Sequence, residues 1–245
     1  MALDELTRQL RRECPWDREQ DERSIVPHTV EEAYELADAA QRGDDTKLLD
    51  ELGDVLFQVH FLALLLEERG AGSLSDVAEH VRQKLIRRHP HVFSDVEVAS
   101  AGEVLQNWDQ IKQTEDGRER GIFGEVPENL PGTLYARKVQ RRTATSGLDV
   151  DDVPHDALEA HAEQLRDVSD DRDARFAEIG DTLFAAVNVA RKLDVDPELA
   201  LRASADRFRG RIEAAERIAG GEWQRLSRDD KLRCYAQARM EEDTP

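Results

Sequence analysis

Two seven-residue segments of this chain are near copies of each other. Residues 51–57 read ELGDVLF and residues 178–184 read EIGDTLF, so that five of the seven positions are identical. In each copy a Glu and an Asp lie three residues apart in a helical apolar pattern, which places both carboxylates on one helix face. Two carboxylates beside a core repel each other unless a cation lies between them. The copies therefore predict a metal site within a duplicated unit.

Two further patterns recur in the same order and at nearly the same spacing. Each consists of two residues four positions apart: Lys84 and Arg88 recur as Arg207 and Arg211, and Trp108 and Lys112 recur as Tyr235 and Arg239. A single short match would be consistent with chance. Three matches in one order indicate an internal duplication.

The apolar periodicity is helical throughout, and the alternation typical of strands is missing. The predicted helices cover residues 30–41, 46–69, 77–88 and 102–113 in the first half, and 133–143, 156–167, 172–193, 197–219 and 229–240 in the second. The first of these helices is expected to begin after Pro27, with Thr29 as its cap.

The fold class that follows is all-α, with two tandem repeats of about four helices. Residues 1–113 form the first repeat, residues 114–132 a Gly/Pro-rich linker, and residues 133–245 the second repeat. A repeat of this size has a modest core, so we expect the repeats to be paired into helical bundles by dimerisation.

The helix predicted over residues 46–69 carries an apolar stripe and an acidic flank. The stripe is expected to form the core, and it consists of Leu48, Leu49, Leu52, Val55, Leu56, Val59, Leu62 and Ala63. Glu51 and Asp54 lie on the flank. The preceding helix offers Glu32 and Glu35, and a short connection makes the two helices antiparallel neighbours.

Four carboxylates across one gap suit Mg²⁺ or Mn²⁺, which prefer oxygen ligands. The alternative is a solvated acidic face. In the second repeat the predicted ligands are Glu163, Glu178 and Asp181, and Ala160 stands where the first repeat has Glu32. One carboxylate is then missing, so by ligand count the first repeat is the predicted active one, while the basic and aromatic groups of the second repeat keep it a candidate.

Composition excludes several classes of function. The net charge of −19, from 53 acidic and 34 basic residues, would repel a polynucleotide. The longest apolar run, residues 55–66, is interrupted by Gln58 and His60, so no membrane span is expected. The absence of a secretory pattern and the presence of only two cysteines predict a cytoplasmic protein. The acidic excess fits either adaptation to salt or a GC-rich genome.

Several strings together resemble the MazG family of all-α nucleoside triphosphate pyrophosphohydrolases. They are CPWD at 14–17, EEAYE at 31–35, ELGD at 51–54, KLIRRHPHVF at 84–93, LQNW at 105–108 and VNVAR at 187–191. The resemblance implies Mg²⁺-dependent hydrolysis of nucleoside triphosphates to NMP and pyrophosphate. It implies that Glu32, Glu35, Glu51 and Asp54 are metal ligands and catalytic residues.

Substrate-binding groups are expected at the two recurring basic patterns. Lys84, Arg88 and Lys112 are predicted to hold phosphates, and Trp108 to stack on the base. Arg207, Arg211, Tyr235 and Arg239 are the corresponding groups of the second repeat. Glu32 is the candidate general base, because it is the quartet member that the second repeat lacks.

Other functions remain open from the sequence alone. The chain fits a non-hydrolysing nucleotide-binding or sensor module, a relative specific for dUTP or dCTP, or a structural helical dimer. If the chain is a nucleoside triphosphate pyrophosphohydrolase, a homodimer is expected. The sequence does not fix the base and sugar preference, the active repeat, the number of metal ions, the general base or any regulatory partner.

Overall fold

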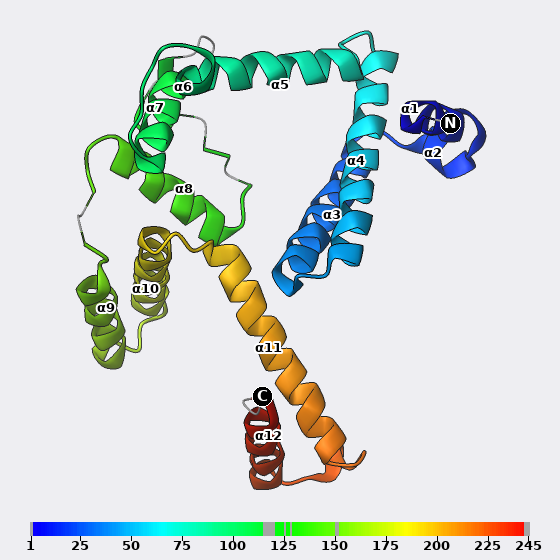
Figure 1. Ribbon diagram of the computed structural model, residues 1–245. Helices are drawn as coiled ribbons and strands as arrows, with labels where there is room; N and C mark the ends of the chain where they lie inside the picture. Colours follow the sequence, from blue (N-terminus) through cyan, green and yellow to red (C-terminus); the bar gives the residue numbers. More distant parts are fainter. Residues whose placement is uncertain (1, 115–120, 125, 128, 150–151, 243–245) are drawn as a thin grey trace. The chain divides into compact units, whose positions relative to one another are not determined.

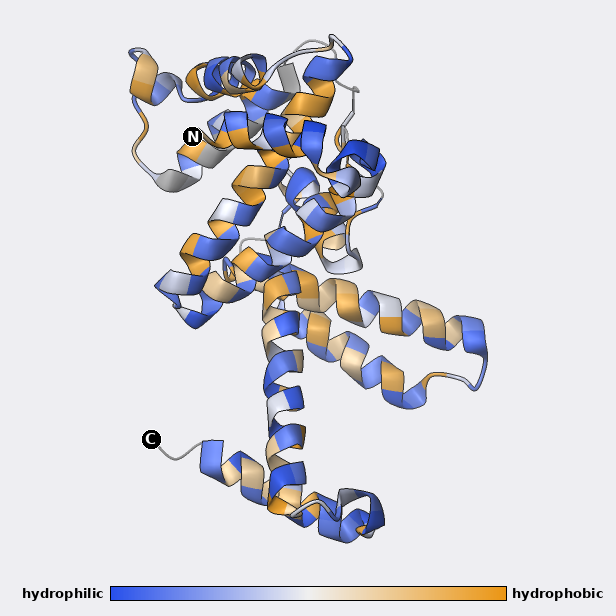
Figure 2. Cartoon of the chain, turned by 90° about the vertical axis from the view of Figure 1, so that its right-hand side faces the viewer, coloured by the Kyte–Doolittle hydropathy of each residue, from blue (hydrophilic) through white to orange (hydrophobic). Residues whose placement is uncertain are grey.

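The computed structural model describes residues 2–114, 121–124, 126–127, 129–149 and 152–242. Every regular element in this part of the chain is a helix, which confirms the predicted all-α class (Figure 1). Most of the helices carry both hydrophilic and hydrophobic residues along their length (Figure 2), as expected for helices that pack on one face. None of the described helices is long and apolar enough to cross a membrane.

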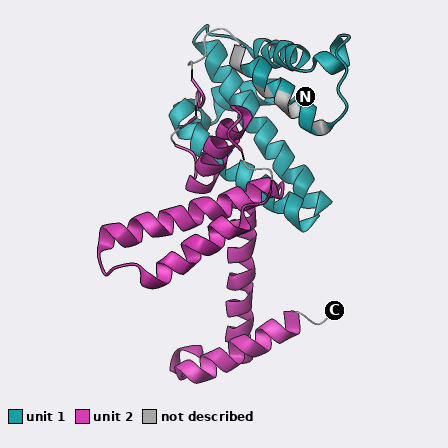
Figure 3. Cartoon of the chain, turned by 90° about the vertical axis from the view of Figure 1, so that its left-hand side faces the viewer, with its two compact units in different colours: residues 1–114 teal, residues 115–245 magenta. Residues whose placement is uncertain are grey.

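The chain divides into two compact units, residues 1–114 and 115–245 (Figure 3). Unit 1 contains α1 (Leu3–Glu13), α2 (Pro15–Glu19), α3 (Glu22–Arg42), α4 (Asp45–Glu68), α5 (Leu74–Arg88), α6 (Pro90–Phe93) and α7 (Ala101–Thr114). Unit 2 contains α8 (Gly132–Thr145), α9 (His155–Asp167), α10 (Arg172–Lys192), α11 (Pro197–Ile218), the 3-10 turn η1 (Trp223–Arg225) and α12 (Arg228–Glu242). The predicted linker, residues 114–132, falls partly on positions 115–120, 125 and 128, which lie outside the described residues.

The two units repeat one arrangement. Each is built on an antiparallel hairpin, α3–α4 in unit 1 and α9–α10 in unit 2. A preceding helix, α1 or α8, packs on the second helix of the hairpin. A third helix, α5 or α11, then leads away and carries α7 or α12 at its far end (Figure 1). This parallel order of contacts agrees with the duplication seen in the sequence.

Helix α3 begins at Glu22, so the prediction that it begins after Pro27 is wrong. Asp21 caps the helix, because its carboxylate accepts the Ser24 N–H at 2.9 Å while the Ser24 hydroxyl accepts the Asp21 N–H at 2.9 Å. Pro27 lies inside the helix, where proline costs about 3 kcal/mol. Burial of Ile25 against Phe61 and Leu65 offsets this cost by about 2–3 kcal/mol.

Helix α4 turns part of its polar flank inward and much of its leucine row outward. Glu51, Gln58 and Phe61 are buried. Leu49, Leu52, Leu56 and Val59 are exposed, Leu49 by 74%. The prediction that the whole stripe forms the core is therefore wrong for these four residues, although Ala63 is buried and Leu48, Val55 and Leu62 are half-buried.

The outward row exists because α3 covers only one face of α4. The corresponding row on α10 is exposed too: Phe176, Ile179 and Leu183 occupy the positions of Leu49, Leu52 and Leu56. Phe176 is 82% exposed. Rows of large apolar side chains open to water are typical of surfaces that bind another protein.

We expect Ile25→Ala to lower the free energy of unfolding of unit 1 by about 2–4 kcal/mol, because the side chain is 2% exposed and its removal leaves a cavity. The control is the neighbouring Val26→Ala, which should change stability by less than about 0.5 kcal/mol, since Val26 is 48% exposed. Denaturant unfolding of both variants checks this. Equal losses would contradict the packing of α3 described above.

Candidate metal centre

Three carboxylates converge in the α3–α4 hairpin of unit 1. Glu32 and Glu35 on α3 and Glu51 on α4 each offer an oxygen, and these oxygens all lie within 4.8 Å of one another. Glu51 is 1% exposed, whereas Glu32 is half-buried and Glu35 is exposed. The group thus extends from a buried carboxylate between the helices to the solvent.

Glu51 has one ion-pair partner, and both of its oxygens are buried without a hydrogen-bond donor among the described residues. The ammonium of Lys47, one turn earlier on α4, contacts its Oε1 atom. Its Oε2 atom is buried without a hydrogen-bond partner among the described residues. A buried carboxylate oxygen in this state is costly unless a cation binds it. The residues present therefore fit a divalent cation that takes oxygen ligands.

Asp54 lies outside this group of three but acts on it electrostatically. The pKa of Glu32 is raised, first by burial and then by the charges of Asp54, Glu35, Glu51 and Glu31. Asp54 is exposed and borders an open hollow of about 620 Å³ that Lys47, Asp50 and Gly53 also line. Asp54 thus lies close enough to the group for its charge to raise the pKa of Glu32, and it is on the side that faces solvent.

Lys47 was not identified from the sequence. Its spacing of four residues from Glu51 is usual for an ion pair along a helix, and this spacing could have indicated the Lys47–Glu51 pair. The sequence does not show whether such a pair faces water or the interior. In the structure the carboxylate end of the pair is buried and the ammonium end is about half exposed.

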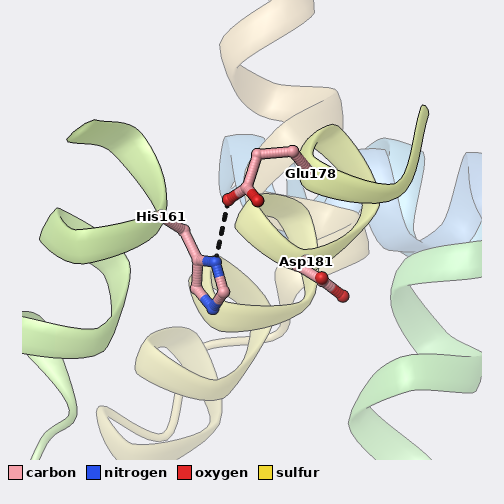
Figure 4. A group of neighbouring side chains, drawn as sticks. All are labelled: His161, Glu178 and Asp181. Carbon is pink, nitrogen blue, oxygen red and sulfur yellow. Dashed lines mark hydrogen bonds and ion pairs between the residues drawn. The ribbon is translucent and has the colours of Figure 1, made fainter. Parts of the chain in front are cut away.

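In unit 2, the group that corresponds to the three carboxylates of unit 1 contains a histidine. His161, Glu178 and Asp181 each offer a ligand atom, and these atoms lie within 4.8 Å of one another. Figure 4 shows the His161 ring reaching from α9 toward the Glu178 carboxylate on α10. Glu163 is exposed on α9 and is not part of this group. The sequence interpretation did not include His161, although it lies only two positions from Glu163.

The basic and aromatic residues of unit 1 form a second cluster, at the junction of α5 and α7. The Arg88 Cζ and Lys112 Nζ atoms each lie 5.3 Å from the centre of the Trp108 ring. Arg88 is buried, and Lys84 is one turn earlier on α5. Arg88 is the last residue of α5, and α5 leads away from the end of α4 (Figure 1).

The corresponding residues of unit 2 gather around Glu242 on α12. Arg211 Nε donates to Glu242 Oε2 at 2.5 Å. The pKa of Glu242 is lowered, first by this hydrogen bond and also by the charges of Arg207 and Arg239. The pKa of Arg211 is raised by Glu242 and then by Tyr235. The predicted basic group of unit 2 is therefore present as one cluster.

Comparison with known proteins identifies the family. Residues 20–93, which cover the carboxylates of unit 1, match the MazG nucleotide pyrophosphohydrolase domain. The chain is 38% identical over 213 residues to a nucleoside triphosphate pyrophosphohydrolase of Escherichia coli strain K12, an alignment that covers 84% of this chain and 81% of that protein.

Two further relatives agree with this result. A nucleoside triphosphate pyrophosphohydrolase/pyrophosphatase MazG of Thermotoga maritima is 39% identical over 208 residues, covering 84% of this chain and 80% of that protein. A nucleoside triphosphate pyrophosphohydrolase of Mycobacterium tuberculosis is 30% identical over 200 residues, covering 77% of this chain and 61% of that protein. The chain belongs to the MazG family.

We expect Glu32→Gln to stabilise the metal-free protein at neutral pH. A raised carboxyl pKa means that the contribution of Glu32 to stability is fully present below its ordinary pKa of 4.5 and is lost as the pH rises through the raised value. A neutral amide removes this loss. The melting temperature in a chelator should rise by roughly 1–2 °C, since 1 kcal/mol corresponds to about 2–4 °C for a chain of this size.

The matched control is Glu31→Gln on the same helix, because Glu31 is exposed and is the weakest of the charges that act on Glu32. It should change the melting temperature less than Glu32→Gln does. A lower melting temperature for Glu32→Gln in chelator would show that the carboxylates of unit 1 do not repel one another in the fold.

Proposed function

We propose that unit 1 is a metal-dependent nucleoside triphosphate pyrophosphohydrolase that releases NMP and pyrophosphate. The observation that carries this proposal is the buried Glu51, whose Oε2 atom has no hydrogen-bond partner in the described part of the chain while Glu32 and Glu35 lie alongside. Such a group needs a cation, and a triphosphate needs the same cation to approach an acidic surface. Family membership and the printed activity of the relatives support the reaction.

Glu32, Glu35, Glu51 and Asp54 are the proposed ligands of the metal. All four supply carboxylate oxygens, which favour Mg²⁺ and admit Mn²⁺. When bound, the metal neutralises charge on the phosphates and makes a water molecule easier to deprotonate. Lys47 contacts Oε1 of Glu51, which leaves Oε2 as the oxygen that would bind the metal.

Glu32 is the proposed proton acceptor. Its pKa in the metal-free protein is raised by burial and by its acidic neighbours, and a carboxylate within reach of the attacking water can accept its proton. The water oxygen forms a bond to the α-phosphorus, and the bond from that phosphorus to the bridging oxygen breaks. The bridging oxygen leaves with pyrophosphate, and the new hydroxyl stays on NMP.

We also propose that the working unit is a homodimer. The outward row of α4 exposes Leu49, Leu52 and Leu56 to water, and burial of apolar surface yields about 25 cal/mol per Å². Lys84 and Arg88 belong to the last turns of α5, a helix that leads away from the α3–α4 hairpin (Figure 1). A second copy that covers the leucine row can bring its own α5 to the carboxylates, which supplies the missing phosphate contacts.

One test of this proposal locates the active unit. Asp54→Asn should lower the rate of pyrophosphate release by more than about 100-fold, since a metal-centred site supplies several kcal/mol of transition-state stabilisation. Asp181→Asn, the matched change on α10, should leave most of the rate. Coupled detection of pyrophosphate with Mg²⁺ and a panel of triphosphates measures both. The reverse order of effects would place hydrolysis in unit 2.

Another test concerns the shared site. Glu51→Gln and Lys84→Ala should each be inactive alone, and each should fold as judged by circular dichroism. If one copy supplies Glu51 and the other Lys84, mixed dimers contain one intact site, and an equal mixture after subunit exchange should regain about a quarter of the wild-type rate. No recovery in dimers shown to be mixed would mean that both residues act within one copy.

A further inference from the structure

The hairpin of unit 2 brings a nitrogen donor into the acidic group. His161 Nδ1 lies 3.0 Å from Glu178 Oε1. Glu178 and Asp181 lie one turn apart on α10, and the imidazole approaches from α9 (Figure 4). All three side chains offer a ligand atom within a span of 4.8 Å. The group therefore joins two helices through three potential metal ligands of two chemical kinds.

The pair is set into the hairpin rather than spread over its surface. The side chain of Glu178 is 19% exposed and that of His161 is 32% exposed. In unit 1 the equivalent Glu51 contacts Lys47 one turn earlier on its own helix. Unit 2 has Ala174 at that position, and Glu178 meets the imidazole of the neighbouring helix instead. The corresponding glutamates, buried in unit 1 and half-buried in unit 2, thus have different charged partners.

The donor set decides which ion fits. Unit 1 offers only carboxylates, which suit Mg²⁺. An imidazole nitrogen instead favours divalent transition-metal ions: its affinity is higher for Co²⁺ than for Mn²⁺, and it also binds Zn²⁺ well. Ligands about 2.1 Å from one such ion lie roughly 3.0–3.4 Å apart. The 3.0 Å between His161 Nδ1 and Glu178 Oε1 is already close to that separation.

We propose that His161, Glu178 and Asp181 form a second metal site, which binds a divalent transition-metal ion in preference to Mg²⁺. The ion joins α9 to α10 and so holds the hairpin of unit 2 together. This site does not depend on the hydrolysis proposed for unit 1, because it shares no residue with that site. The chain then carries two sites of different metal preference.

The test uses Co²⁺ as the probe, because its visible spectrum reports the ligands directly. The full chain carries Glu51→Gln to weaken the site of unit 1, and Co²⁺ and Mg²⁺ are titrated by visible absorption and calorimetry. We expect Co²⁺ to bind at least about 100-fold more tightly than Mg²⁺, and His161→Ala to weaken Co²⁺ binding by at least about 100-fold. His155→Ala, an exposed histidine on the same helix, is the matched control and should change neither.

A second variant keeps the test independent of folding defects. His161→Glu restores an all-oxygen set and should reduce the preference for Co²⁺ over Mg²⁺ by at least about tenfold, and its helix content in chelator is measured by circular dichroism. The proposal is overturned if His161→Ala weakens Co²⁺ binding by less than about tenfold, or if Co²⁺ and Mg²⁺ bind the parent equally well. Pyrophosphate release is not a readout here, so failure of the hydrolysis proposal leaves this result intact.

Discussion

A carboxylate buried beside other carboxylates is the constraint on which unit 1 depends. Glu51 lies between α3 and α4, where Lys47 contacts one of its oxygens and no described residue donates a hydrogen bond to the other. Glu32 and Glu35 add negative charge at the same place, and a cation bound there would relieve the repulsion among the three carboxylates. The same rotation of α4 that buries Glu51 turns the leucine row outward. The acidic site and the apolar surface are thus two consequences of one helix orientation.

The two units show how a duplicated hairpin can diverge without changing its fold. The glutamate and aspartate of the second hairpin helix are kept, while their surroundings differ. Lys47 corresponds to Ala174, and His161 enters from α9 where unit 1 presents Glu32 and Glu35. Because Mg²⁺ and transition metals differ in their response to an imidazole ligand, this small set of changes is enough to separate the metal preferences of the two units.

Much of the fold could be predicted from sequence, because helical periodicity and the repeat are local patterns. The start of α3 could not, because the Asp21–Ser24 cap and the burial of Ile25 against Phe61 together offset the usual cost of Pro27. The outward leucine row depends on the small number of helices that cover α4. In the candidate site, the spacing of residues predicts that Glu32, Glu35 and Glu51 lie close together. It does not show that His161 rather than Glu163 faces Glu178, because this depends on the rotation of α9 about its axis. Nor does spacing show that α5 carries Lys84 away from α4.

The central claim is that the carboxylates of unit 1 support attack of water at the α-phosphorus. The most direct measurement is product analysis after hydrolysis of a panel of ribo- and deoxyribonucleoside triphosphates in ¹⁸O-labelled water with Mg²⁺, at low and high KCl. The account predicts NMP and pyrophosphate in equal amounts, with the label in NMP. Release of NDP and orthophosphate, or label in pyrophosphate, would contradict it.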